Sequence, residues 1–322
     1  MTTIEECLMK GVVTGMTRSI GIDIGGTSIK TALTEEGSVL DFRTVETPVD
    51  DPRQGAAEIH RLISDWMSLA DGSIGICAPG PLDTMEGRFL DPPNLPGWHG
   101  FSLKDELEDK TGRQCLVEND ANAAAVGEFM YGAGRSFQHI VYVTISTGIG
   151  AGIVIDGKLL SGAQFQAGEA GNMIIRSEGP EQPGMNIGSW ESLASGTALG
   201  IRAEKEIGLT GGAAEVFREQ ASGNQKAARL VSSWIEDTAC GTANLLHLLN
   251  PEAVIFGGGV MNAAAQILPE LQREVESRVY ESMRSGVQLY AAELKNQAGV
   301  IGAAALDHVP RIGAGTSAGR SI

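Results

Sequence analysis

The pattern that most constrains the fold is an order of predicted elements that occurs twice along the chain. In each copy three predicted strands joined by short turns come first, and predicted helices and strands alternate after them. The second copy begins after Gly132-Ala133-Gly134. Short apolar strands alternating with amphipathic helices are typical of α/β domains. The sequence therefore predicts a duplicated α/β domain with a cleft between the two copies.

The predicted strands and helices fill most of the chain. The strands expected in the first copy are residues 19–24, 28–34, 38–45, 74–77 and 114–117, and the helices are 51–70, 101–111 and 121–130. Those expected in the second copy are strands 139–145, 150–155, 158–161, 253–256 and 287–292, with helices 192–207, 223–249 and 261–283. The domains expected are 18–136, to which a helix at 298–308 returns, and 137–297, with a disordered extension at 1–17 and a flexible tail at 309–322.

Composition excludes several classes of function. The 322 residues carry a net charge of −16, which argues against binding to nucleic acid or to an anionic membrane surface. The four cysteines are far apart in the sequence, so we expect reduced thiols in a cytoplasmic protein rather than disulfides or a CxxC metal site. No signal peptide or membrane span is predicted. An anionic substrate would need metal or backbone amides to offset the acidic surface.

The segment Glu118-Asn119-Asp120-Ala121-Asn122 lies between a short apolar strand and an Ala-rich helix. Acids and amides that follow a strand lie at the carboxyl edge of a sheet, where open α/β sheets bind ligands. The alternative interpretation is that Asn119 or Asp120 only caps the helix.

Glycine-rich turns occur at corresponding places in the two copies. Gly25-Gly26-Thr27 and Thr147-Gly148-Ile149-Gly150 would let backbone amides approach an anion, although each could be an ordinary hairpin turn. Asp23 precedes the first turn, and a carboxylate beside a phosphate predicts Mg²⁺ between them, bound directly or through water. Gly257-Gly258-Gly259 opens a helix and could contact a nucleotide or be a tight connection. Neither a GxGxxG fingerprint nor a GxxxxGK[ST] loop is present.

Taken together, these motifs resemble the ROK family of sugar kinases and sugar-responsive regulators, from Ile20 to about Asp307. The resemblance implies the family's fold, two RNase H-like domains of the actin/hexokinase type with an interdomain cleft. It is based on the order and spacing of Asp23-Ile24-Gly25-Gly26-Thr27, Ala78-Pro79-Gly80-Pro81-Leu82-Asp83, Asn94-Leu95-Pro96-Gly97-Trp98, Glu118-Asn119-Asp120-Ala121-Asn122, Thr147-Gly148-Ile149-Gly150-Ala151-Gly152, Gly168-Glu169-Ala170-Gly171, Glu191 with Ala194-Ser195-Gly196, and Gly257-Gly258-Gly259-Val260.

The resemblance implies transfer of the γ-phosphoryl group of ATP to a hydroxyl, usually O6, of a hexose or hexosamine. Asp120 would be the general base, and Asp23 would contact Mg²⁺. The residues implied in sugar binding are Gly80, Asn94, Asn119, Asp120, Glu169, Asn172 and Glu191. Those implied in nucleotide binding are Gly25, Gly26, Thr27, Lys30, Thr147, Gly148 and Gly258. The family also suggests a homodimer.

The chain departs from the family at its zinc-binding segment. Asn172 occupies the position of the usual His, and no cysteine lies between Cys115 and Cys240. Because Asn and Ser are poor zinc ligands, we predict no structural zinc. The usual His contacts the sugar near C1 and C2, so its replacement favours an amino sugar or another modified hexose.

Two alternatives to a kinase remain open at this point. One is a sugar-responsive regulator, but only 19 residues precede Ile20, too few for the expected helix-turn-helix domain. The other is a sugar-binding protein without catalysis, against which Asp23 and Asp120 both argue. Polyphosphate as the donor in place of ATP is a further possibility.

Overall fold

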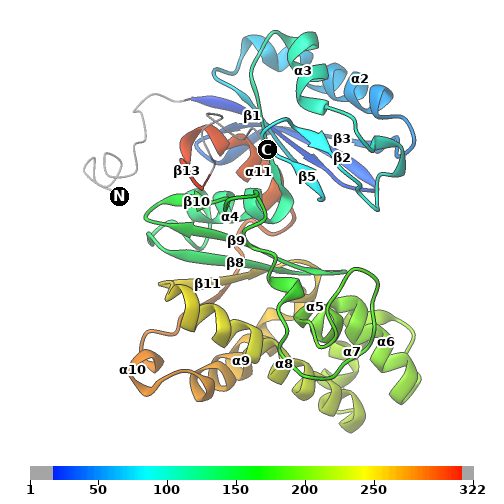
Figure 1. Cartoon of the computed structure of the whole chain (residues 1–322), viewed down its shortest axis with the longest axis vertical. Helices are drawn as coiled ribbons and strands as arrows, with labels where there is room; N and C mark the ends of the chain where they lie inside the picture. The colour runs from blue at the N-terminus through cyan, green and yellow to red at the C-terminus, as the bar shows by residue number, and fades with distance from the viewer. Residues whose placement is uncertain (1–16, 314–322) are drawn as a thin grey trace, which may run out of the picture. The chain divides into compact units, whose positions relative to one another are not determined.

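The structure, a computed structural model, describes residues 17–313 (Figure 1). Over these residues the chain forms two compact units. The first comprises residues 17–135, 154–167 and 296–313, and the second comprises residues 136–153 and 168–295. The first unit is therefore assembled from three stretches that are far apart in the sequence.

The first unit is built on a five-stranded sheet. Its main strands are β1 (Arg18–Ile24), β2 (Ser28–Glu35), β3 (Ser38–Glu46), β4 (Ile74–Ala78) and β7 (Cys115–Asn119), in the order β3-β2-β1-β4-β7. Its helices are α2 (Pro52–Ile63), α3 (Leu103–Thr111), α4 (Asp120–Tyr131) and α11 (Ala298–Ala304). Short elements are η1 (Ser64–Ser68), β5 (Leu82–Asp83), β6 (Arg88–Phe89), η2 (Pro96–Trp98) and η6 (Leu306–His308). The first three strands are antiparallel, whereas β4 and β7 run parallel to β1.

The two faces of this sheet differ in what covers them. Ile20, Ile22 and Ile24 of β1 are buried in one hydrophobic core with residues of α2 and α3. The residues that alternate with them face α11, which packs on β1, β4 and α4. A Cβ atom at Gly75 would lie only 1.7 Å from the carbonyl oxygen of Ala303. Glycine is thus required where α11 touches the sheet.

The second unit contains the other parallel strands. Its elements are β8 (Ile140–Ile145), the start of β9 (Ile149–Ile155), η3 (Ala170–Asn172), α5 (Trp190–Ala194), α6 (Gly196–Ile207), α7 (Gly212–Ala221), α8 (Gln225–Leu249), β11 (Ala253–Gly257), η4 (Gly259–Ala263), α9 (Ala264–Arg278), α10 (Glu281–Arg284), β12 (Leu289–Ala291) and the start of η5 (Lys295–Gln297). The strand order is β12-β11-β8-β9, with β11 parallel to both β8 and β12. The end of β9 belongs to the first unit, where β10 (Lys158–Leu160) pairs with it and β13 (Arg311–Ile312) pairs with β10.

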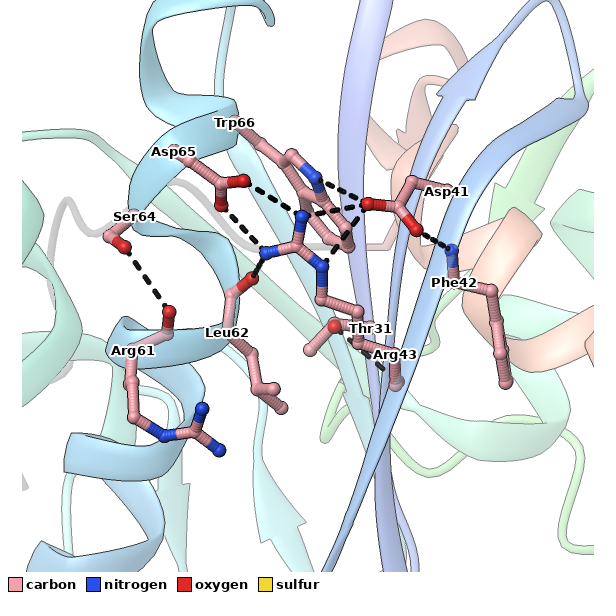
Figure 2. Close-up of polar contacts among 9 residues, drawn as sticks. All are labelled: Thr31, Asp41, Phe42, Arg43, Arg61, Leu62, Ser64, Asp65 and Trp66. Carbon is pink, nitrogen blue, oxygen red and sulfur yellow. Dashed lines mark hydrogen bonds and ion pairs between the residues drawn. The ribbon is translucent and has the colours of Figure 1, made fainter.

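A polar network fixes the edge strand β3 to the segment that follows α2. Figure 2 shows the guanidinium group of Arg43 between the carboxylates of Asp41 and Asp65, with N–O distances of 2.7 Å to each. The guanidinium carbon lies 4.3 Å from the centre of the Trp66 ring, and the indole N–H of Trp66 donates to Asp41. The Arg43 guanidinium is the main cause of the lowered pKa of both carboxyl groups.

Several elements differ from the predicted ones. The helix predicted at 51–70 is an α-helix only to Ile63 and continues as the 3₁₀-helix η1. The helix predicted at 192–207 is divided in two at Ser195, whose extended backbone and side-chain acceptor cap α6. α7 lies where no helix was predicted. None of the described helices is both long and apolar enough to span a membrane.

The two ends of the chain are described only in part. Residues 1–16 of the predicted extension and 314–322 of the predicted tail lie outside the described residues. Within the predicted flexible tail, the structure instead has β13, whose main chain bonds to that of β10.

Candidate functional site

The carboxyl ends of three parallel strands bring the first group of predicted site residues together. Asp23 of β1 lies opposite Cys77 of β4, and Cys77 lies opposite Glu118 of β7. The next residue of β7, Asn119, lies opposite Ala78. The segments that leave these strands therefore start at one edge of the sheet, the usual place for a ligand in an α/β fold.

The Asp23 carboxylate is held at both of its oxygens. Lys30 lies opposite Asp23 on β2, and its ammonium group is 2.8 Å from Asp23 Oδ2. The thiol of Cys77 donates to Oδ1 over 3.6 Å. Cys77 is fully buried, and this burial raises the pKa of its thiol, with the negative charges of Asp23 and Asp120 adding to the effect. Asp23 and Asp120 thus both lie close to Cys77.

The turn from β7 into α4 has a defined hydrogen-bond pattern. Asn119 is the N-cap of α4, since its Oδ1 accepts from the amides of Ala121 at 2.8 Å and Asn122 at 3.4 Å. Asn119 therefore does cap the helix, as the alternative interpretation expected of one of these two residues. Asp120 is the first residue of the helix; its Oδ1 accepts from the Ala121 amide at 2.7 Å, and the residue is exposed. The Asp120 carboxylate thus accepts a main-chain hydrogen bond, and the residue is accessible to a ligand from solvent.

Two loops adjoin this turn and the first hairpin. A Cβ atom added to Gly80 would lie 3.7 Å from the side-chain nitrogen of Asn119. One added to Gly26 would lie 2.9 Å from Cβ of Asn94, so the loop that carries Asn94 rests on the hairpin turn of Gly25-Gly26-Thr27. Asn94 and Thr27 are both exposed.

In the second unit, Glu191 of α5 contacts the second glycine-rich turn. Its Oε2 accepts from the amide of Ile149 at 2.7 Å, and a Cβ atom at Gly148 would lie 2.5 Å from the same oxygen. Its Oε1 accepts from the side chain of Gln182 at 3.3 Å. Burial raises the pKa of Glu169, and the negative charge of Glu191 adds to this effect. The two predicted sugar-binding carboxylates therefore lie near each other.

Asn172, the other predicted sugar-binding residue of this unit, takes part in closing a loop. Its Oδ1 accepts from the amide of Asn186 at 2.7 Å, and its carbonyl oxygen accepts from the side-chain amide of Asn186 at 3.2 Å. The loop 173–190 returns to its starting point through the bridge between Ile174 and Ser189. One oxygen of Asn172 is thus committed to this loop.

A cavity of about 760 Å³ lies in the second unit beside the turn at Thr147. Its lining includes Gly196 and Thr197 of α6, Phe217 of α7 and Gly259 of η4. The adjacent Gly258 has φ +86°, and a Cβ atom there would lie 2.3 Å from the carbonyl oxygen of Ile145. This volume is of the size that holds a drug-sized ligand or cofactor.

Sequence reasoning missed the part of this cavity that α6 and α7 supply. α7 starts with Gly212-Ala213-Ala214, small residues that carry no helical period, so the pattern gave no sign of the helix. Ser195-Gly196, already noted as part of a motif, was the one available signal for the wall formed by α6.

The predicted site residues fall into two groups, one in each unit. The first unit holds Asp23, Gly25, Gly26, Thr27, Lys30, Gly80, Asn94, Asn119 and Asp120. The second holds Thr147, Gly148, Glu169, Asn172, Glu191 and Gly258.

The carboxylates of the first group suit a hard cation. Mg²⁺ takes oxygen ligands and usually binds through one or two carboxylates, water and substrate phosphates. Asp23, the predicted contact of Mg²⁺, supplies such oxygens at the end of β1. In residues 17–313 no group of three or more His, Cys, Asp or Glu side chains is arranged to hold a metal ion. The donor set fits a magnesium ion shared with a phosphate.

Comparison with known proteins gives a consistent result. The profile of the ROK family matches residues 19–309. A glucokinase from Thermotoga maritima is 32% identical over 306 residues, which are 89% of this chain and 96% of that protein. An N-acetylmannosamine kinase from Vibrio cholerae is 34% identical, with 81% and 90% covered, and the xylose repressor of Bacillus subtilis is 30% identical, with 90% and 77% covered.

Solved structures agree with this result. The ROK hexokinase from Thermus thermophilus has a TM-score of 0.82 at 32% identity, covering 89% of this chain and 97% of that one. A ROK family glucokinase from Streptomyces griseus, in complex with glucose and AMPPNP, has a TM-score of 0.75 at 31% identity, with 90% and 98% covered. The predicted α/β class and the resemblance drawn from the motifs are confirmed. The chain belongs to the ROK family.

Proposed function

We propose that this chain, an ATP-dependent sugar kinase of the ROK family, phosphorylates O6 of a hexose or hexosamine with Asp120 as the general base. The observation that carries the proposal is the exposed carboxylate of Asp120 at the start of α4. It lies at the carboxyl edge of the sheet, and its backbone position is fixed by the cap that Asn119 provides.

The proposed reaction forms one bond, breaks one bond and transfers one proton. The hydroxyl oxygen of the sugar forms a bond to the γ-phosphorus, the bond from that phosphorus to the bridging oxygen of ADP breaks, and the hydroxyl proton passes to the carboxylate of Asp120. A positioned base contributes about 10²–10⁴-fold to such a reaction. The remainder comes from alignment and from stabilisation of charge on the phosphoryl group.

The nucleotide would be held by backbone amides and by the cavity of the second unit. The turns at Gly25-Gly26-Thr27 and Thr147-Gly148 offer amides and hydroxyls to phosphates, and the cavity beside Thr147 has room for a nucleoside. Asp23 would hold Mg²⁺, directly or through water. When bound, Mg²⁺ neutralises negative charge on the phosphates. Lys30 is proposed as a further cation near the phosphates, because it lies opposite Asp23 in the sheet.

Amide and carboxylate groups are proposed to bind the sugar. Asn94, Asn119, Glu169 and Glu191 can pair with hydroxyl groups as donors and acceptors. Groups that bond a substrate hydroxyl reject analogues that lack it, because a buried polar group is then left unpaired. Asn172 is proposed to line the same site through the part of its side chain not bound to Asn186.

The test is an ADP-release assay across glucose, mannose, fructose, allose, their 2- and 3-amino derivatives and N-acetylhexosamines. We expect turnover with at least one hexose or hexosamine and none with its 6-deoxy analogue. Turnover of the 6-deoxy sugar would rule out O6 as the acceptor. The Asp120→Asn variant should lose at least about 10²-fold in kcat while still binding the sugar. Near wild-type turnover in that variant would exclude Asp120 as the base.

A sugar-responsive regulator is the second candidate, and the similarity to the xylose repressor is the observation that favours it. A regulator would bind sugar without turning over ATP. Calorimetric binding of a sugar, together with no ADP release for any sugar in the panel, would support this second function or that of a non-catalytic sugar-binding protein. We further propose that the protein is cytoplasmic and forms a homodimer; light scattering of the purified protein would test the dimer.

A further inference from the structure

Glu118 is a buried carboxylate directly before the turn that carries Asp120. It is 1% exposed. Its Oε1 accepts from the amide of Asn119 at 2.9 Å and from the side chain of Asn122 at 3.0 Å. These two donors lie on either side of Asp120 in the sequence. A rotation of the Glu118 side chain would therefore disturb the turn on both sides of Asp120.

The charge of Glu118 is balanced by Arg311. Nε of Arg311 lies 3.5 Å from Oε2 of Glu118, and its Nη2 donates to the carbonyl oxygen of Val117 at 3.3 Å. The Arg311 side chain is itself only 17% exposed. One guanidinium group thus contacts both the side chain and the main chain at the end of β7, the last strand in the sheet order.

Arg311 is held in place by main-chain bonds of the segment 310–313. The amide of Leu159 donates to the carbonyl oxygen of Pro310 at 2.8 Å, and that of Ser161 donates to Ile312 at 2.9 Å. A Cβ atom at Gly313, where φ is +88°, would lie 3.0 Å from the backbone nitrogen of Gly162. Main-chain contacts therefore fix the segment 310–313 to residues 159–162 on both sides of Arg311.

We propose that Arg311 is a positioning residue for Asp120 and that residues 310–313 hold the turn between β7 and α4 in its working geometry. The proposal rests on the proposed function only in taking Asp120 as the base. Without the guanidinium, Glu118 is a buried carboxylate without this counter-charge, which is a costly state. The side chain then moves toward water, and the turn that it holds shifts with it.

The kinetic test compares Arg311→Met, Arg311→Lys and the double variant Arg311→Met/Glu118→Gln. Arg311→Met should lower kcat by about 10²-fold, the typical effect of misplacing a reacting group by about 1 Å, with KM for ATP unchanged. Arg311→Lys should recover part of the loss because it restores the cation. The double variant should also have a higher kcat than Arg311→Met, because Glu118→Gln removes the uncompensated charge. Wild-type kcat in Arg311→Met would overturn the proposal.

Hydrogen exchange supplies a readout that does not depend on activity. In Arg311→Met, amides of residues 119–122 should exchange faster than in the wild type, whereas those of β11 should not. Arg18→Met is the matched control, since Arg18 pairs with Glu35 at 3.0 Å in the same sheet and should affect neither kcat nor this exchange. Unchanged exchange at 119–122 in Arg311→Met would overturn the proposal. Faster exchange in a protein that phosphorylates no sugar would uphold the role of Arg311 and refute only the proposed function.

Discussion

Asn119 offers a prediction that separates capping of a helix from binding of a sugar. Its Oδ1 accepts two backbone N–H bonds at the start of α4, whereas its Nδ2 points to the side of Gly80. Replacing an N-cap Asn by Ala costs about 1 kcal/mol of stability, while Ser caps almost as well as Asn. Asn119→Ala should therefore lower the free energy of unfolding by about 1 kcal/mol, and Asn119→Ser should leave it nearly unchanged.

The effect of these two variants on sugar binding should differ from their effect on stability. Both remove the amide donor, and a hydrogen bond to a neutral hydroxyl contributes about 1 kcal/mol, or about fivefold in affinity. KM for the sugar should therefore rise about fivefold in both variants. Urea unfolding gives the stability, and the ADP-release assay gives KM.

A matched control comes from the N-cap of α8. Asn224 accepts the corresponding two bonds, at 3.0 and 3.3 Å from the amides of Lys226 and Ala227. Asn224→Ala should lose similar stability and keep the wild-type KM. If Asn119→Ser also keeps the wild-type KM, Asn119 only caps the helix and the assignment to the sugar site fails.

Three further predictions concern the second unit. Gly258→Ala should lower the free energy of unfolding by about 1–3 kcal/mol, because its positive φ and its contact with Ile145 exclude a side chain; an unchanged melting temperature would contradict this. Burial raises the pKa of Asp237. Above about pH 4 the unfolded chain has released the proton of this carboxyl group, whereas the native state still holds it. The free energy of unfolding should therefore fall as the pH rises from about 4 to the native pKa. Asp237→Asn should flatten that slope in urea unfolding between about pH 4 and the native pKa, and an equal slope would exclude Asp237 as its source. Gly148→Ala should displace the Glu191 carboxylate and raise KM for the sugar, whereas an unaltered KM would argue against Glu191 as a sugar ligand.

Local patterns predicted the strands of the first unit well. The ends of β1, β2 and β3 lie within one residue of the expected ones, because alternating apolar residues and glycine turns both mark them. Helix ends and breaks were harder to predict. Ser195 divides one predicted helix by capping the next, and the pattern of apolar residues continues across the break.

The site residues that could be predicted are those that follow a strand or form a turn. At these places the sequence motif and its position after a predicted strand both indicate a ligand site. Their partners could not be predicted in this way. Arg311 contacts Val117 across 194 residues of sequence, and no local pattern signals that pairing. The loop-closing bonds of Asn172 to Asn186 likewise depend on how the loop 173–190 folds back.

The contact of α11 with β1 and β4 has a consequence for synthesis of the chain. A ribosome delivers residues 17–135 long before residues 298–304, so one face of the first sheet stays uncovered until α11 has been made. During that time Gly21 and Gly75 present bare backbone to the surroundings. Newly made chains of this protein should therefore depend on chaperones until α11 emerges, and C-terminal truncations before residue 298 should be insoluble.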